Sequence, residues 1–306
     1  MINKDINERI INVFVNELHA NKDDIKFIMK HEGGMSNLTY LFSVNNKKYA
    51  VHYTEKNGLR FVNRDYELSA LNVTKNNPFV QKCVYFDKEN LDLRIYEYID
   101  GTSLNSLDYK NYIKEISDSL KSFHQMNKFD YDYKPFDYLT KMENEVHKDD
   151  LNELYNESKN VLLTKRSQLV NRELYPCHND AQPSNLVLSN DNKVYIIDLE
   201  FAANNDYLYD IATFGNLEFK YSILLLNEYK KNHSKDELLY LILWRIFINM
   251  QWYLVAKEKY HLGYNEILNL DFNDIGYFFL NKNRELIDLI KNDKILEYEK
   301  EVLKNG

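Results

Sequence analysis

The segment at residues 177–201, CHNDAQPSNLVLSNDNKVYIIDLEF, constrains the fold of this chain more than any other stretch. It contains two short β-rich runs, Leu186–Leu188 and Val194–Ile197, with the turn-forming residues Ser, Asn, Asp and Asn between them. Short apolar runs interrupted by such residues are typical of a β-hairpin. The segment is therefore predicted to fold as a loop that leads into two antiparallel strands.

Three side chains in this segment have a spacing that fits phosphoryl transfer. Asn185 follows Asp180 by five positions, and the second strand of the hairpin leads to Asp198. Kinase chemistry needs a carboxylate that orients the acceptor hydroxyl, and an amide with a second carboxylate that holds magnesium against the phosphates. Each residue alone is common in turns, but the three in this register predict a catalytic loop. His178 is interpreted as a hydrogen-bonded residue that orients this loop, because Asp180 already fills the role of the base.

The N-terminal third of the chain is predicted to be rich in strands. Asn45-Asn46 lies between the runs Leu38–Val44 and Lys47–Thr54. Asn tolerates the positive φ angles of a two-residue hairpin turn, so these runs are predicted to pair antiparallel. The other elements expected here are helices at residues 3–18 and 64–74 and strands at Cys83–Phe86 and Leu91–Tyr98, followed by a turn at Asp100-Gly101.

Beyond Gly101 the apolar period becomes that of a helix. Residues three and four positions apart share one helical face at Ile113, Ile116, Leu120 and Phe123. Most of the remaining chain is predicted to be helical, apart from the hairpin already described. The predicted fold class is α+β with two lobes, a small β-rich N-terminal lobe at residues 1–97 and a larger, mostly helical lobe at residues 98–306.

The small lobe contains candidate nucleotide-binding residues. A glycine turn precedes the first hairpin strand, where Gly34, Ser36 and Asn37 would bring backbone amides close to a phosphate. In the second strand, alternation places Ala50 and His52 on one face. Kinases carry Ala-x-Lys at such a position, with the small residue under the adenine and the lysine on the phosphates. This chain has a histidine where the lysine would be.

We expect His52 to face the phosphates as a protonated imidazolium. The phosphate charge and the carboxylate of Glu67, on the helix that follows, would both favour the charged form. ATP binding would then weaken as the pH rises through neutrality. Lys56 is the alternative phosphate contact.

Seven motifs together resemble the choline/ethanolamine kinases, and most closely the bacterial LicA-type choline kinases. They are GGMSN (33–37), YAVHY (49–53), VNRDYE (62–67), YEYIDGTSL (96–104), HNDAQPSN (178–185), IDLEF and YDIA (209–212). The resemblance as a whole extends from about Gly33 to Lys257. The resemblance implies the protein-kinase-like fold that this family shares with aminoglycoside phosphotransferases. It also implies ATP and Mg²⁺ as cofactors and choline as the acceptor.

The resemblance further implies roles for individual residues. Asp180 would be the catalytic carboxylate, with Asn185 and Asp198 as magnesium ligands. Asp210 matches a structural residue of the family and is also a candidate helix N-cap. The hinge that meets the adenine would be Glu97, Tyr98 and Ile99, and the acceptor pocket would be lined by Gln182, Glu200, Phe201, Glu218 and Trp252.

Composition and charge exclude several other classes of protein. A formal net charge of −8 would repel a nucleic acid, so no nucleic-acid partner is expected. Two cysteines cannot form a disulfide framework, and no zinc-ligand spacing is present. The N-terminus has no apolar signal core, and the apolar stretch Leu238–Ile248 is too short to span a bilayer and is predicted to be a buried helix. We therefore expect a cytoplasmic protein without membrane insertion.

Two alternatives to a choline kinase remain open from the sequence. The acceptor could be ethanolamine or an aminoglycoside, with the same fold and chemistry. Alternatively, the chain could be a degenerate kinase that binds nucleotide without turnover, for which His52 is the one supporting observation. The complete set of Asp180, Asn185 and Asp198 argues against that second alternative.

Overall fold

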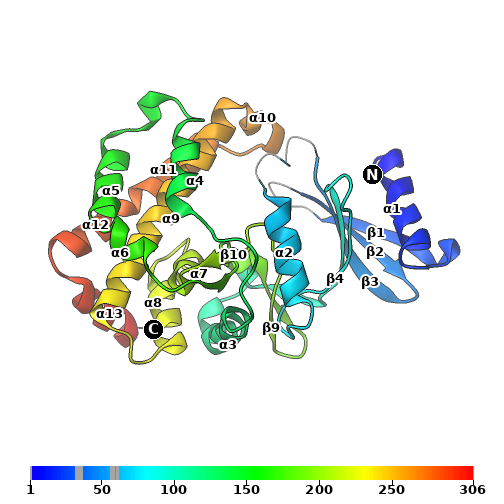
Figure 1. Cartoon of the computed structure of the whole chain (residues 1–306), viewed down its shortest axis with the longest axis horizontal. Helices are drawn as coiled ribbons and strands as arrows, with labels where there is room; N and C mark the ends of the chain where they lie inside the picture. The colour runs from blue at the N-terminus through cyan, green and yellow to red at the C-terminus, as the bar shows by residue number, and fades with distance from the viewer. Residues whose placement is uncertain (1, 32–36, 56–58, 60–61, 306) are drawn as a thin grey trace.

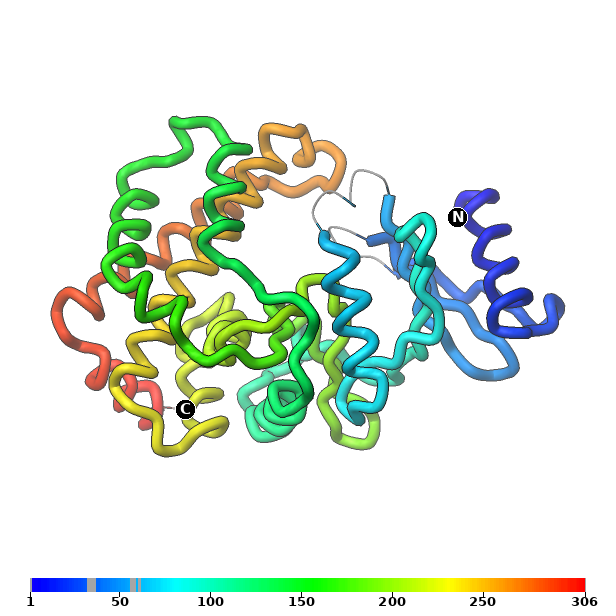
Figure 2. Tube along the Cα trace, in the orientation of Figure 1, coloured from blue at the N-terminus to red at the C-terminus, as the bar shows by residue number. Residues whose placement is uncertain are grey.

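The protein has two lobes that lie side by side (Figure 1). The structure is a computed structural model, and it describes residues 2–31, 37–55, 59 and 62–305. The chain begins in a lobe built around a β-sheet and ends in a lobe built mostly of helices, so the two termini lie in different lobes (Figure 2). The predicted α+β, two-lobed fold class is confirmed. The exact division at residues 97 and 98 stays a prediction.

The N-terminal lobe is a five-stranded antiparallel sheet with one helix on each side. Its strand order is β1 (Ile25–His31), β2 (Leu38–Val44), β3 (Lys47–Tyr53), β5 (Leu93–Glu97), β4 (Cys83–Phe86). Helix α1 (Lys4–Asn16) packs Ile10 and Phe14 against Phe42, Val51 and Ile95 of the sheet, all of them buried. Helix α2 (Arg64–Thr74) lies on the other side, toward the helical lobe (Figure 1).

The predicted β2–β3 hairpin is confirmed, and its turn has the expected backbone. Asn45 and Asn46 have φ angles of 50° and 64°, the left-handed values that a two-residue hairpin turn needs. Strand β1 was not predicted from the sequence. Its side chains are exposed or half-buried throughout, so it has no buried face and no apolar alternation, and it is held by its backbone ladder to β2.

Gly101 was expected in a turn, but it begins strand β6 (Gly101–Ser103), which pairs with the hairpin of the second lobe. A Cβ atom at this position would lie 2.3 Å from the carbonyl oxygen of Leu188. Glycine is therefore required here by the close approach of two backbones and not by a turn conformation.

The C-terminal lobe is organised around α9 (Lys235–His261). The other helices of this lobe are α3 (Ile113–His124), α4 (Pro135–Glu143), α5 (Glu153–Thr164), α6 (Arg166–Val170), α7 (Tyr207–Phe214), α8 (Lys220–Tyr229), α10 (Tyr264–Leu268), α11 (Phe272–Asn281), α12 (Asn283–Lys291) and α13 (Ile295–Asn305). Helix α9 is long and apolar enough to cross a membrane, yet 72% of its most apolar window is buried inside the lobe. The predicted burial of Leu238–Ile248 is thus confirmed for most of that stretch.

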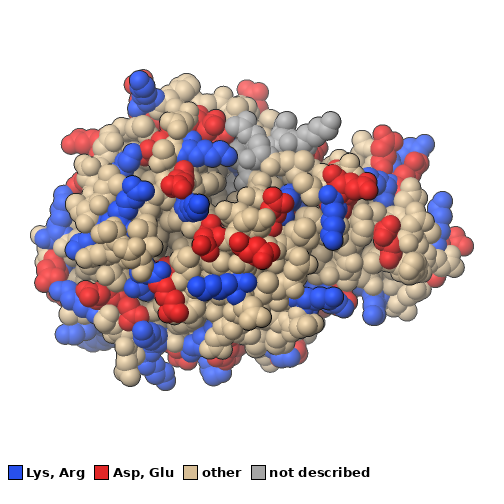
Figure 3. Space-filling view, in the orientation of Figure 1, with Lys and Arg blue, Asp and Glu red and all other residues tan. Residues whose placement is uncertain are grey.

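Two small sheets hold the segment between the lobes that carries the predicted catalytic loop. Strand β7 (Tyr175–Cys177) pairs with β10 (Ala203–Asn205), and β8 (Leu186–Ser189) pairs with β9 (Val194–Ile196) and with β6. The predicted hairpin is confirmed within one residue at its ends. On the face in Figure 3, basic and acidic side chains are interspersed, as expected for a chain with a modest net charge.

Candidate active site

The loop after β7 brings Asp180 and Asn185 together. The Asn185 Nδ2 donates to Asp180 Oδ2 at 2.8 Å and to the Asp180 carbonyl at 2.9 Å. Gln182 Nε2 donates to the same carboxylate oxygen at 3.3 Å. A 3₁₀ turn at Pro183–Asn185 closes the loop. The geometry that the five-residue spacing predicted is therefore present.

Burial raises the pKa of the Asp180 carboxyl well above its usual range, and the negative charge of Glu200 adds to this effect. A carboxylate with a raised pKa is a stronger proton acceptor than an ordinary aspartate. Its Oδ2 is occupied by amide donors. This leaves Oδ1 as the oxygen able to accept a bond from an acceptor hydroxyl.

His178 orients the loop. Its Nδ1 accepts from the Asp180 backbone N–H at 3.1 Å, so its Nε2 carries the proton and donates to the Ile197 carbonyl at 2.8 Å. Burial lowers the pKa of His178, which keeps the ring neutral. Because both ring nitrogens bind backbone groups, His178 holds the loop against the strand that leads to Asp198.

Asp210 braces the loop from α7. Its carboxylate accepts from the backbone N–H groups of His178 at 2.8 Å and Asn179 at 2.7 Å, and it lies 3.0 Å from Nε2 of His124. The N-cap of α7 is Asp206, so the alternative N-cap role for Asp210 is wrong. Helix α7 begins at Tyr207, before the start that an N-cap at Asp210 would require. Asp210 therefore lies inside its first turn.

Asp210→Asn is expected to lower the free energy of unfolding by about 2–3 kcal/mol, because an amide nitrogen cannot accept from a backbone N–H. Urea unfolding measures this change. Asp118→Asn, which affects an exposed carboxylate paired with Lys114 on α3, is the control and should change stability by less than about 0.5 kcal/mol. Equal stability of the Asp210 variant and the wild type would show that the loop does not depend on this brace.

Asp198 lies at the end of the strand as predicted, in a left-handed backbone conformation with φ 63°. Its Oδ1 is buried and has no hydrogen-bond partner among the described residues. Burial raises its pKa well above the usual range, and the charges of Glu200 and Glu67 raise it further. A buried carboxylate oxygen without a donor is a ligand available to a hard cation such as Mg²⁺.

The charges around this oxygen also fit a divalent cation. Four carboxylates interact electrostatically here, those of Glu67, Asp180, Asp198 and Glu200, against the two guanidinium groups of Arg64 and Arg94. Among the described residues, carboxylates outnumber cations here even when Lys259, which also interacts with Glu200, is counted. A divalent cation such as Mg²⁺ would offset this excess, and Asn185 and Asp198 stay the predicted ligands.

Comparison with known proteins is consistent with this geometry. Residues 28–237, more than half of the chain, match the phosphotransferase enzyme family. The chain belongs to that family. It is 25% identical over 277 residues to Protein LicA of Haemophilus influenzae, an alignment that covers 82% of this chain and 81% of the relative.

Two solved structures share the fold of this phosphotransferase. The choline kinase LicA from Streptococcus pneumoniae superposes with a TM-score of 0.74 at 23% identity, covering 92% of this chain and 98% of that one. A choline/ethanolamine kinase family protein from Mesorhizobium loti has a TM-score of 0.75 at 15% identity and covers 96% and 99%. The predicted resemblance and the kinase-like fold are confirmed.

The protonated form predicted for His52 is wrong for this phosphotransferase. The side chain is buried, its Nδ1 has no partner among the described residues, and its pKa is lowered to about 3 by burial and by the charges of Arg94 and Arg64. Glu67, the expected partner of His52, pairs instead with those two arginines. The ring is therefore neutral at physiological pH in the protein without nucleotide.

The residues predicted to meet the adenine lie within the described part of the chain. Ala50 is buried opposite Tyr96 of β5. In the hinge, the backbone N–H of Glu97 donates to Lys82 and that of Tyr98 to Lys48, so among the described residues Ile99 has the one hinge N–H without a partner. Gly34, Ser36 and the alternative Lys56 lie outside the described residues. The described Asn37 has a role between the lobes, because its Nδ2 donates to Glu200 Oε2 at 3.0 Å.

The five residues predicted to line the acceptor pocket do not all lie beside Asp180. Gln182 lies beside Asp180 and also accepts from Asn216 at 2.9 Å. Phe201 follows the catalytic segment and is half-buried, whereas the Glu200 side chain points toward Asn37 and Arg64 of the other lobe. Glu218 pairs with Lys220 at the surface (2.6 Å), and Trp252 stacks on Phe279 with ring centroids 5.8 Å apart. The acceptor role of these residues stays a prediction.

Sequence reasoning missed a group of tyrosines beside Asp180. Tyr133 lies 5.5 Å from Tyr209 and 6.1 Å from Tyr138 between ring centroids, and Tyr209 donates to Gln251 at 2.6 Å. Burial raises the pKa of Tyr138 to about 12, and the charges of Glu258 and Asp180 contribute. Tyr138 is therefore close to both carboxylates. With 25 tyrosines in the chain, no local pattern could single these out.

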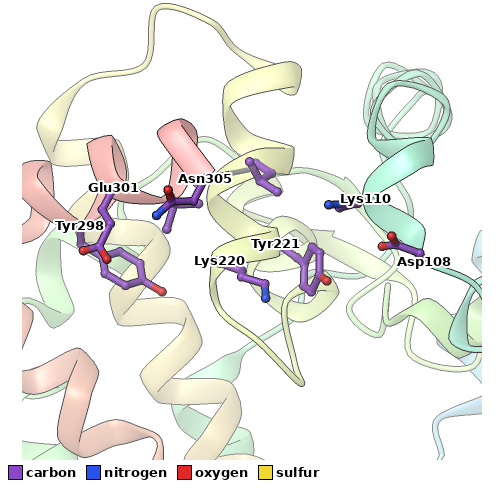
Figure 4. Close-up of a pocket in the computed structure, with 9 residues that line it drawn as sticks. Asp108, Lys110, Lys220, Tyr221, Tyr298, Glu301 and Asn305 are labelled. Carbon is purple, nitrogen blue, oxygen red and sulfur yellow. The ribbon is translucent and has the colours of Figure 1, made fainter.

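A cavity of about 380 Å³ lies elsewhere on the helical lobe, among residues of α8, α13 and the 3₁₀ turn that precedes α3 (Figure 4). Its lining includes Asp108, Lys110, Lys220 and Glu301. None of the predicted site residues lines it. The candidate active site is therefore the set of side chains around Asp180 and not this cavity.

Proposed function

We propose that this phosphotransferase uses ATP and Mg²⁺ to phosphorylate the hydroxyl of choline, which gives phosphocholine and ADP. The observation that carries the proposal is the pairing of Asp180 with Asn185 beside the unpartnered oxygen of Asp198. The choline kinase LicA, which shares the fold over 98% of its length, supports choline as the acceptor. Since ATP is the donor, we propose a cytoplasmic reaction.

In this proposal Asp180 orients the acceptor hydroxyl and receives its proton as the phosphoryl group is transferred. Mg²⁺, held by Asn185 and Asp198, would neutralise charge on the phosphates. His178 and Asp210 fix the loop, so the carboxylate needs no rearrangement when substrate binds. Ala50 and the free N–H of Ile99 would meet the adenine.

The tyrosines beside Asp180 suit a trimethylammonium group. Choline's cation is spread over methyl groups and has no hydrogen-bond donor, so an aromatic face with a nearby carboxylate binds it with little loss of hydration. The rings of Tyr133 and Tyr138, with Glu258 close by, provide such a surface. Ethanolamine's ammonium is strongly hydrated and would lose water hydrogen bonds on the same surface.

We expect kcat/KM to be about tenfold or more higher for choline than for ethanolamine, because one desolvated cation–π contact contributes about 2 kcal/mol. A coupled ADP-release assay with purified protein measures both substrates. Tyr138→Ala should raise the KM for choline and leave the KM for ATP unchanged, and the matched control Tyr138→Phe, which retains the ring, should behave as the wild type.

Each result of this assay has a clear meaning. Equal use of ethanolamine would retain the kinase and refute the aromatic argument. Turnover on an aminoglycoside and on neither amino alcohol would refute the acceptor class. Nucleotide binding without ADP release on any acceptor would favour the degenerate kinase.

A further inference from the structure

Position 52 of strand β3, where kinases carry a lysine, holds no positive charge here. His52 is neutral and lies directly opposite Arg94 of β5 in the sheet register. Burial and the charges of Arg94 and Arg64 both disfavour an imidazolium at this position. Among the described residues, a phosphate-binding cation would therefore have to come from another element.

Glu67 of α2 forms ion pairs with two arginines. Arg64 Nη1 donates to Glu67 Oε2, while Arg94 Nε lies 3.2 Å from Glu67 Oε1. Tyr96 also donates to Oε1, at 2.9 Å. Glu67 is fully buried, so its charge requires these partners.

The two arginines differ in what they can reach. Arg94 has no exposed surface, and its two Nη atoms donate to Thr54 at 2.6 Å and to Asn37 at 2.9 Å. It is therefore a positioning residue that anchors Glu67 and the ends of two strands. Its place in the interior of the sheet leaves it no access to a ligand.

Arg64 lies at the boundary between the lobes. It is 6% exposed, and its Nη1 lies 3.8 Å from Glu200 Oε2 of the segment that carries Asp198. Its Nη2 donates to Thr54 at 2.6 Å, whereas its buried Nε has no hydrogen-bond partner among the described residues. An unpartnered guanidinium donor, on a side chain that also contacts Glu200, is available to an anion.

We propose that Arg64 of α2 supplies the phosphate-binding cation of this enzyme, held against Glu67 with Arg94 in support, in place of a basic residue on β3. The ligand groups it would bind are the β- and γ-phosphates of a nucleoside triphosphate. The inference rests on the proposed use of ATP and adds the residue that would bind its phosphates. Arg64 can do this because separate nitrogen atoms serve Glu67, Thr54 and the phosphate.

The test compares ATP with adenosine, which lacks phosphates, by titration calorimetry on the full chain. The wild type should bind ATP more tightly than adenosine. Arg64→Gln should weaken ATP binding about tenfold to a hundredfold, the scale of one charge-assisted hydrogen bond, and change adenosine binding less than twofold. The double variant H52K/R64Q, which returns a cation to β3, should regain ATP affinity to within about threefold of the wild type.

The control is Arg9→Gln. Arg9 is likewise bound to two carboxylates, Asp87 and Asp92, but it lies on α1 on the other side of the sheet. This variant should retain the preference for ATP. If R64Q does not fold, Arg64→Met serves instead, because it keeps much of the side-chain length and removes the charge, and it must weaken ATP binding relative to adenosine.

An unchanged preference for ATP in R64Q, or in R64M where that variant replaces it, would overturn the inference. A folded H52K/R64Q protein that does not regain ATP affinity would also overturn it, since Arg64 would then be structural. A wild type that binds ATP no better than adenosine would refute the proposed function itself, and the inference with it.

Discussion

Asp180→Asn is expected to lower the turnover number by at least about a hundredfold, the usual scale for a positioned acid–base group. The amide cannot take the proton of the acceptor hydroxyl. Nucleotide binding and the thermal midpoint should change little, because the Asp180 backbone bonds to His178 and Asn185 remain. A coupled ADP-release assay at saturating choline and ATP measures the turnover number.

The control for this variant is Asp191→Asn. Asp191 is an exposed carboxylate in the turn of the neighbouring β8–β9 hairpin, where it pairs with Lys193. Its replacement should leave turnover within about twofold of the wild type. Turnover of D180N within a few-fold of the wild type would remove Asp180 from the mechanism.

Asp198→Asn is expected to abolish the dependence of nucleotide binding on Mg²⁺ while it stabilises the metal-free protein. A hard cation without its carboxylate ligand returns to water. In the metal-free protein, however, this carboxylate is buried without a partner and close to other carboxylates. Removing its charge should raise the free energy of unfolding at pH 7 by about 1–3 kcal/mol.

The pH dependence has a definite sign. The pKa of Asp198 is raised in the folded state, so the folded protein binds this proton more tightly than the unfolded chain does. Stability should therefore fall as the pH rises above the ordinary aspartate value of about 4, and the advantage of D198N should shrink toward that pH.

Thermal unfolding from pH 4 to pH 8, with and without Mg²⁺, measures the stability, and nucleotide titration with and without Mg²⁺ measures the binding. Asp191→Asn again provides the control, with neither change expected. Retained Mg²⁺ dependence in D198N would contradict the assignment of this ligand.

The elements that the sequence predicted correctly are those specified by neighbouring residues. The β2–β3 turn follows from the tolerance of Asn45 and Asn46 for positive φ, and α2 begins after Asn63, whose side chain caps the helix. Strand β1 was missed because it has no buried face. Its existence depends on pairing with β2, and pairing leaves no local pattern in the sequence.

The sequence by itself determined the family. It also determined the loop after β7, because five positions of chain suffice to bring Asn185 back to Asp180. Only the tertiary structure decided the charge state of His52 and the partners of Glu67. Protonation depends on burial and on groups that the fold brings near, and Arg94 reaches His52 through strand pairing. The contact between Asn37 and Glu200, 163 positions apart, likewise exists only once the two lobes are assembled.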